Sequence, residues 1–177
     1  RWEAVQKFNM LANLMQRRIS GNEENLSLSY QIKGMENGQL AENMEIWYNE
    51  MLHGLNNEEI YRGVTCVGPH RDDIIVSVNG INLKSFGSQG QQRTAVLSMK
   101  LSELEFIRSE TGEYPVLLLD DVMSELDAGR RQQLLNFIER EGIQTLITAT
   151  DEAYFQQAPL KTYFQVEAGQ VKVVDKV

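Results

Sequence analysis

Hydrophobic and polar positions divide the chain into a mainly helical first part and an α/β second part. Residues 1–19 and 40–55 carry apolar side chains at helical spacing, whereas residues 26–33 alternate as in a half-buried strand. Asn56 begins a capping-box pattern, which predicts a further short helix. We therefore expect residues 1–62 to form a mainly helical region.

Strand signals dominate from Gly63 onward. An apolar run closed by a Gly-Pro pair predicts a short strand over residues 64–68. The alternation on both sides of Asn79-Gly80 predicts a hairpin, because this pair tolerates the positive φ angles of a type I′ turn. A second hairpin is expected over residues 161–174.

A long helix and two apolar strands form the centre of the second part. Helical spacing extends over residues 89–109, and a continuous apolar run from Pro115 is typical of a strand covered on both faces. Asp127 is suited to cap the next helix, and residues 143–148 form another buried strand. The order strand, helix, strand predicts a right-handed crossover and parallel pairing, so residues 63–177 are expected to form an α/β unit.

Composition and charge indicate an ordinary soluble domain. The 177 residues are 42% hydrophobic and 24% charged, and no apolar run suits a membrane span or a secretory leader. Cys66 is the single cysteine, so no disulfide forms within the chain, which suits a protein of the reducing cytoplasm. The first residue is Arg1, which predicts a piece of a longer protein. The net charge of −8 is opposite in sign to the basic excess of a free-standing nucleic-acid binder. Any contact with DNA is therefore expected from a local patch or from elsewhere.

A glycine-bearing turn before the long helix is the first candidate binding site. Ser88 offers a hydroxyl, and Gly90 lets the backbone come close to a ligand. The helix that follows points free amide groups and its positive dipole end at the same place, where a polyphosphate would be held well. The alternative is a plain N-capped helix, because short Gly/Ser motifs often match by chance.

Two adjacent carboxylates, Asp120 and Asp121, follow the first buried strand. They are expected at the carboxyl edge of a parallel sheet, where ligands bind in open α/β folds. One carboxylate there can hold Mg²⁺ through its water shell, and the other can orient an attacking water. The alternative is a solvated strand end whose acids cap the next turn.

Other polar and aromatic residues carry weaker signals. The loop Ser124–Asp127 and the pair Thr150-Asp151 could reach the same sheet edge or could simply begin helices. His53 and His70 lack neighbours at metal-binding spacing, so no zinc site is expected, and residues 70–73 could form an ion-pair turn. The aromatic residues of the first part are expected in the core or at an interface: Tyr30, Trp47, Tyr48 and Tyr61.

The motifs together resemble the C-terminal half of an ABC-type ATPase head, with its P-loop NTPase-like parallel sheet and flanking helices. The phosphate loop Gly-x-x-x-x-Gly-Lys-Ser/Thr, which forms the other half of such a site, does not occur in the chain. More narrowly, residues 68–73, 90–94 and 118–127 closely resemble the RecF family of bacterial recombination mediators, relatives of SMC and Rad50 heads. The resemblance implies that residues 1–62 form an arm-like lobe and residues 63–177 the C-terminal α/β part of the head.

The resemblance also implies roles for individual residues. Ser88, Gly90 and Gln91 would form the signature motif, which contacts the γ-phosphate of ATP bound to the opposite subunit. Asp120 would be the Walker B carboxylate that serves Mg²⁺, and Asp121 would occupy the place of the catalytic carboxylate.

The same resemblance implies roles for a loop and for one further residue. The D-loop that crosses the dimer interface would consist of Ser124, Glu125, Leu126 and Asp127. Thr150 falls where transporters of this class carry a switch histidine, and it cannot take up charge. Asp121 is also shorter than the glutamate usual in transporters, so both departures favour a slow, switch-like ATPase over a fast pump.

The function implied is that of an ATP-dependent homodimer that closes on DNA in recombinational repair, replication and the SOS response. Its expected setting is the cytoplasm, away from membranes, with other recombination mediators as partners. The alternatives are an SMC-like or Rad50-like head, whose long heptad arms are missing, and a non-catalytic DNA-clamp scaffold. Without a phosphate loop, the chain alone is expected neither to hydrolyse ATP nor to bind it tightly.

Overall fold

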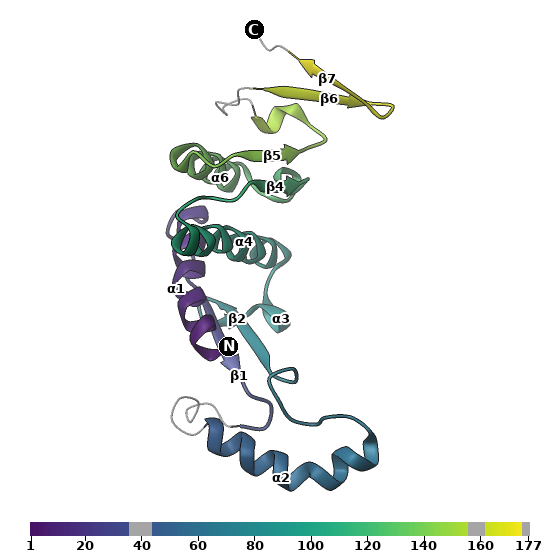
Figure 1. The fold of residues 1–177 in the computed structure, drawn as a ribbon. Coiled ribbons are helices and arrows are strands. Elements are labelled where there is room, and N and C mark those ends of the chain that lie inside the picture. Colours follow the sequence, from purple (N-terminus) through teal and green to yellow (C-terminus); the bar gives the residue numbers. More distant parts are fainter. Residues whose placement is uncertain (36–43, 156–161, 175–177) are drawn as a thin grey trace.

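The computed structural model describes residues 1–35, 44–155 and 162–174, whose elements follow one another along an elongated molecule (Figure 1). In chain order the elements are α1 (Trp2–Ile19), β1 (Leu26–Gln31), α2 (Met44–Arg62), β2 (Asp73–Val78), β3 (Ile81–Asn82), α3 (Leu83–Phe86), α4 (Gln89–Thr111), β4 (Leu117–Asp120), α5 (Val122–Glu125), α6 (Ala128–Glu141), β5 (Thr145–Thr148), the 3₁₀ helix η1 (Glu152–Phe155), β6 (Tyr163–Glu167) and β7 (Gln170–Val174). The chain is therefore an α/β protein, as its sequence predicts.

Three small sheets lie in succession among these elements. β1, β2 and β3 form an antiparallel sheet in which Leu26 pairs with Val78, and β6 pairs antiparallel with β7. β4 and β5 run parallel, which confirms the pairing expected from the strand, helix, strand order. Asn79 and Gly80 have φ angles of 50° and 79°, so the first predicted hairpin is also confirmed.

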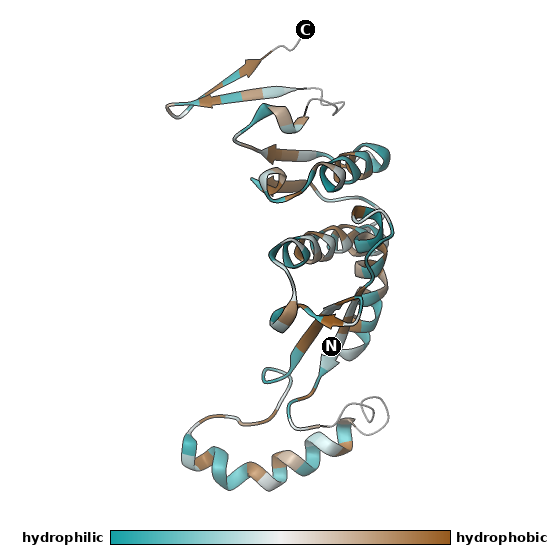
Figure 2. Cartoon of the chain, turned by 180° about the vertical axis from the view of Figure 1, so that it is seen from behind, coloured by the Kyte–Doolittle hydropathy of each residue, from teal (hydrophilic) through white to brown (hydrophobic). Residues whose placement is uncertain are grey.

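Among the described residues, the β4–β5 pair is covered on one face only, so the predicted cover on both faces of β4 is not formed by this part of the chain. Leu117 and Leu119 are buried, whereas Leu118 on the other face is 72% exposed. Leu146 on β5 is 56% exposed, and both strands are hydrophobic in Figure 2. An apolar sheet face therefore lies open in the described part of the chain.

Two hydrophobic clusters fill the interior, and the helices α1 and α4 contribute to both. Met15 of α1 and Leu101 of α4 belong to the cluster that includes β4 and α6. Ala12 of α1 and Ala95 of α4 belong to the cluster beneath β1 and β2. The packing of α1 on α4 and the pairing of β1 with β2 both cross the expected lobe boundary at residue 62, and this division stays a prediction.

Two predicted elements are absent, and one side chain accounts for both differences. No strand forms over residues 64–68, because the Glu59 carboxylate accepts hydrogen bonds from the backbone N–H groups of Cys66 and Val67, at 2.6 and 3.4 Å. Glu59 therefore points forward along the chain instead of capping a new helix at Asn56. α2 consequently continues through Asn56 to Arg62.

The Asp72 carboxylate connects α2 to the first sheet. It accepts hydrogen bonds from the Tyr30 hydroxyl at 2.5 Å and from the Tyr48 hydroxyl of α2. The predicted ion-pair turn over residues 70–73 is wrong, since Arg71 instead donates to the Thr65 carbonyl at 3.0 Å. Tyr30 is buried and Tyr48 half-buried, as predicted, whereas Tyr61 is 91% exposed, which excludes the core and leaves its expected place at an interface a prediction.

High pH is expected to weaken this connection. Burial, and next the hydrogen bond to Asp72, raise the pKa of Tyr48 above its ordinary value of about 10. The stabilising contribution of the neutral phenol is therefore complete below pH ~10 and is lost as the pH rises through the folded-state pKa. Urea unfolding should show a steeper loss of stability above pH ~10 for the wild type than for Tyr48→Phe. Tyr61→Phe serves as the exposed control, and equal slopes for the wild type and Tyr48→Phe would contradict the prediction.

Candidate functional site

The turn before α4 is a capping box. The Ser88 hydroxyl accepts a hydrogen bond from the Gln91 N–H at 3.2 Å, and the Gln91 side chain accepts one from the Ser88 N–H at 3.1 Å. Ser88 and Gly90 are both exposed. The N-capped helix considered from the sequence is thus present. The N–H groups of Gln89 and Gly90 have no partner within the helix and point outward from its positive end.

The two carboxylates lie at the carboxyl end of β4, and Thr148 of β5 orders both. Asp120 pairs with Thr148 in register, and the Thr148 hydroxyl donates to the Asp120 carboxylate at 2.5 Å. The same hydroxyl accepts a hydrogen bond from the Asp121 N–H at 3.0 Å. Both aspartates are exposed. The expected position at a parallel sheet edge is confirmed.

Asp121 adopts a left-handed backbone conformation, with φ of 50° and ψ of 19°. A residue with a side chain reaches this region at a cost of about 1–2 kcal/mol. Its carboxylate is held by the Ser124 hydroxyl, which donates to the Asp121 Oδ2 at 2.9 Å. The two adjacent carboxylates therefore have different hydroxyl partners: Thr148 for Asp120 and Ser124 for Asp121.

The Ser124–Asp127 loop is exposed except at Leu126. Leu126 is 5% exposed and packs into the hydrophobic cluster of this chain, so its side chain is unavailable to another subunit. Glu125 forms an ion pair with Arg93 of α4 at 3.6 Å. Asp127 accepts a hydrogen bond from the Arg130 N–H at 2.9 Å, which confirms that it caps α6.

Thr150 lies just beyond β5 and is exposed. The adjacent Asp151 accepts a hydrogen bond from the Ala153 N–H at 2.8 Å, as expected of a residue that begins the short helix η1. Among the hydrogen bonds between described residues, none joins the Ser88–Gln91 turn to Asp120 or Asp121. The structure thus gathers the carboxylates with Thr148 and Ser124, and leaves the turn separate.

Three residues of this region carry no motif signal. Thr148 orders both carboxylates, and its position opposite Asp120 follows only from the register of the parallel pair. Arg130 and Arg131 lie in the first turn of α6, where a positive charge opposes the helix dipole. That unfavourable placement is the sequence signal that these arginines serve other segments.

Asp120 has the chemistry of a one-carboxylate Mg²⁺ site. In residues 1–35, 44–155 and 162–174, no group of three or more His, Cys, Asp or Glu side chains could hold a metal ion. Mg²⁺ is usually held by one or two carboxylates together with substrate phosphates and waters, so an exposed Asp120 fits this ion. None of the helices that the structure describes is long and apolar enough to span a membrane.

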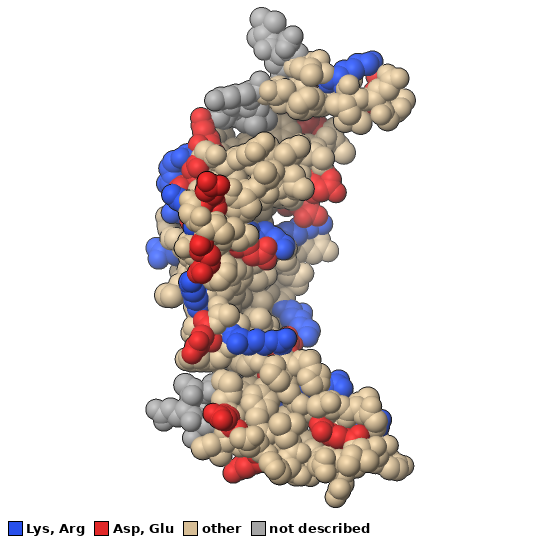
Figure 3. Space-filling model, in the orientation of Figure 1, with Lys and Arg blue, Asp and Glu red and all other residues tan. Residues whose placement is uncertain are grey.

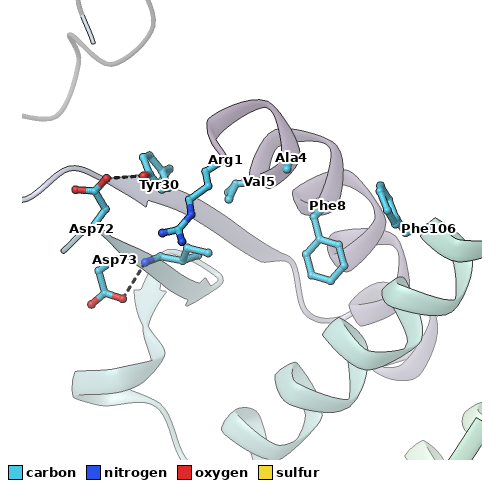
Figure 4. A pocket seen from close by; sticks show the side chains of 9 residues that line it. Arg1, Ala4, Val5, Phe8, Tyr30, Asp72, Asp73 and Phe106 are labelled. Carbon is cyan, nitrogen blue, oxygen red and sulfur yellow. Dashed lines mark hydrogen bonds between the residues drawn. The ribbon is translucent and has the colours of Figure 1, made fainter. Parts of the chain in front are cut away.

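A groove of about 550 Å³ lies away from these residues, beside α1 and β2 (Figure 4). Its apolar lining includes Phe8, Ile74 and Phe106, with Arg1 and Asp72 at its rim. None of the residues predicted to act on a nucleotide lines it. The groove therefore belongs to the packing of α1 on the first sheet.

Comparisons with known proteins decide the family. No model of a protein family matches the chain. The DNA replication and repair protein RecF of Halothermothrix orenii is 50% identical over 154 residues, which cover 85% of this chain and 40% of that protein. RecF of Listeria monocytogenes serotype 4b is 45% identical over 177 residues, which cover 97% of this chain and 47% of that protein. This chain belongs to the RecF family. It spans about half the length of these curated relatives and matches their C-terminal part.

Solved structures give the same result for RecF. The recombination mediator protein RecF with ATP, in the RecFOR pathway, has a TM-score of 0.72 and 34% identity, and covers 98% of this chain and 45% of its own. An SMC ATPase structure has a TM-score of 0.59 at 12% identity over 97% of this chain and 84% of its own, which shows the fold alone. The expected fold, part of an ABC-type ATPase head, is confirmed, and RecF is favoured over the SMC-like alternative.

Removing the Thr148 hydroxyl should loosen the sheet edge. Thr148→Val removes two hydrogen bonds to adjacent aspartates at an exposed site, so we expect urea unfolding to show a loss of about 1 kcal/mol. Thr148→Ser keeps the hydroxyl and should retain most of the stability. Thr150→Val is the exposed control on the same segment, and an equal loss in both valine variants would count against the role of Thr148.

Proposed function

We propose that this chain supplies the signature motif and the Walker B carboxylates of an ATP-dependent DNA-binding ATPase of RecF type. In a complete RecF, this ATPase would act in DNA repair and replication. The observation that carries the proposal is the pairing of Asp120 with Thr148 at a parallel sheet edge, within a chain of this family. The exposed, capped turn at Ser88 supports it.

The turn at Ser88, Gly90 and Gln91 would contact the γ-phosphate of ATP bound to another subunit. Two free amide groups and the positive end of a long helix favour a phosphate there. Gly90 presents no side chain toward a ligand. Within the described residues the turn makes no hydrogen bond to Asp120 or Asp121, which leaves each of them open to contact a different nucleotide.

Asp120 would hold Mg²⁺, which neutralises charge on the transferred phosphate when it is bound. Asp121 would orient the attacking water from the neighbouring position. Its Oδ2 accepts a hydrogen bond from the Ser124 hydroxyl, and its other carboxylate oxygen would accept one from the water. Because Asp121 is shorter than the glutamate usual in transporters, the water would have to lie closer to the backbone, and slow hydrolysis is expected.

The remaining assignments concern partners and setting. The exposed Ser124, Glu125 and Asp127 would face the second subunit of an ATP-dependent homodimer. The open apolar face at Leu118 and Leu146 would pack against the rest of the head in a complete RecF. α2, which lies apart in Figure 1, would belong to the arm-like lobe.

DNA, recombination mediator proteins and a cytoplasmic setting complete the proposal. Basic and acidic side chains are intermixed on the face seen in Figure 3, without a large basic field. DNA contact would therefore require the closed dimer or other parts of RecF. The opposing interpretation is a non-catalytic DNA-clamp scaffold, which the two ordered carboxylates disfavour.

Two substitutions in a full-length RecF with this sequence test the assignment. Asp120→Asn should abolish DNA-stimulated ATP hydrolysis, because the metal loses its carboxylate. Ser88→Arg should block ATP-driven dimerisation, measured by light scattering, because a long cation fills the turn. Asp73→Asn and Ser109→Arg, at exposed positions away from the site, are the matched controls. If both test variants behave like the wild type, the scaffold interpretation is correct.

The isolated chain should not bind ATP tightly. The turn and the carboxylates contact only parts of a nucleotide, and the sequence has no phosphate loop to hold the rest. Isothermal titration calorimetry of the 177-residue chain with Mg-ATP should show no binding with a micromolar dissociation constant. Tight binding would mean that this chain contains a nucleotide site of a different kind.

A further inference from the structure

The Arg130 side chain lies at the meeting point of three segments. Its Nη1 donates to the Thr94 hydroxyl of α4 at 2.7 Å, and its Nη2 donates to Glu24 at 3.0 Å. Its Nε lies 3.4 Å from the carboxylate of Asp127 at the start of α6. One guanidinium therefore joins α4, the loop before β1 and the residue that caps α6.

These contacts extend to the signature turn itself. Thr94 is fully buried, and its hydroxyl donates to the carbonyl of Gly90 at 2.8 Å. A Cβ placed on Gly90 would lie 3.9 Å from Nη1 of Arg130. The guanidinium is thus one hydroxyl away from the backbone of the signature glycine.

The opposite side of Arg130 is equally fixed. Glu24 accepts a hydrogen bond from the side chain of Gln16 at 2.7 Å, and Gln16 is fully buried on α1. The side chains of Arg130 and Glu24 are only 22% and 12% exposed. A half-buried ion pair with further hydrogen bonds holds its geometry far better than a surface pair.

α6 itself gains little from this arginine. A cation in the first turn of a helix opposes the dipole, so Arg130 is unfavourable for α6 unless other segments compensate. The adjacent Arg131 faces a different set of groups, donating to the carbonyls of Met123 and Leu126 at 3.2 and 2.7 Å and lying over the Tyr154 ring. The two arginines therefore hold the D-loop from two sides.

We propose that Arg130 is a positioning residue that fixes the signature turn relative to the D-loop, acting through Thr94. This inference rests on the proposed function. Both elements would contact the second subunit, so a fixed spacing between them lets the dimer form without ordering each one separately. Loss of Arg130 or of the Thr94 hydroxyl should weaken ATP-dependent dimerisation and leave ATP binding by the monomer unchanged.

The test uses a full-length RecF with this sequence and compares Arg130→Met, Thr94→Val and the double variant. A lost hydrogen bond to a charged group predicts a rise of about tenfold in the ATP concentration for half-maximal dimerisation. The double variant should be no weaker than Arg130→Met, because both changes break one chain of contacts. Binding of a fluorescent ATP analogue to the monomer should change by less than about twofold.

Two control variants separate positioning from general destabilisation. Thr94→Ser keeps the bridging hydroxyl and should dimerise like the wild type. Arg140→Met removes an arginine of the same helix whose side chain is 63% exposed and should have no effect. If Arg130→Met does not fold, the comparison of Thr94→Val with Thr94→Ser decides the question.

Three outcomes would overturn the proposal. They are wild-type dimerisation of Thr94→Val, equal weakening in Thr94→Ser and Thr94→Val, and additive effects in the double variant. Ser88→Arg in the same assay distinguishes a failure of the role of Arg130 from a failure of the proposed function. If Ser88→Arg blocks dimerisation while Thr94→Val does not, only the role of Arg130 fails. If Ser88→Arg also has no effect, the proposed function fails and this inference fails with it.

Discussion

The packing of α1 against α4 is the contact on which the rest of the structure depends. Both helices contribute to both hydrophobic clusters, so they separate one interior from the other and join the two. Small buried residues, including Ala12, Ala95 and Ser98, suit a close approach of two helices. Because α4 begins directly after Ser88, the same packing also fixes where the turn of Ser88 and Gly90 lies.

Helix α4 connects the two halves of the candidate site. Ser88 caps its start and Gly90 lies in its first turn, and its inner face packs, through Leu101, into the cluster that supports β4. β4 in turn delivers Asp120 and Asp121 at the edge shared with β5. The turn and the carboxylates are therefore placed by one continuous core, although they make no direct hydrogen bond.

Sequence periodicity predicted the elements whose side chains alternate or repeat regularly. α1, the Asn79-Gly80 hairpin, α4 and the parallel pairing of β4 with β5 all follow from such patterns. The failures occur where a side chain bonds to backbone beyond its own helix, as Glu59 does to Cys66, or where covering requires segments from elsewhere, as at Leu118. No local pattern contains that information.

In the candidate site, too, local patterns predict some residues and tertiary contacts are needed to find the others. The motif residues Ser88, Asp120 and Asp121 could be proposed from sequence because their chemistry and spacing together are distinctive, and their exposed places at a helix start and a sheet edge agree with that proposal. Thr148 carries no such signal, and the unfavourable place of Arg130 in the first turn of α6 does not say which residues it contacts. Each acts on residues that only folding brings near: Asp120 lies 28 positions from Thr148, and Thr94 lies 36 positions from Arg130. Motifs thus identified the groups that would touch a nucleotide, and tertiary contacts identified the groups that hold them.

If the proposed function holds, the positions of the exposed turn and of the two carboxylates give a physical reason for dimerisation. The exposed turn offers amide groups with no helical partner, and the exposed Asp120 and Asp121 offer negative charge, yet the two do not meet within the chain. A nucleotide with its metal carries groups complementary to both. Two subunits in antiparallel contact would place each turn against the nucleotide held beside the other subunit's carboxylates. On the proposed function, phosphate and metal would then satisfy groups that one subunit leaves open, and nucleotide binding and association would be coupled.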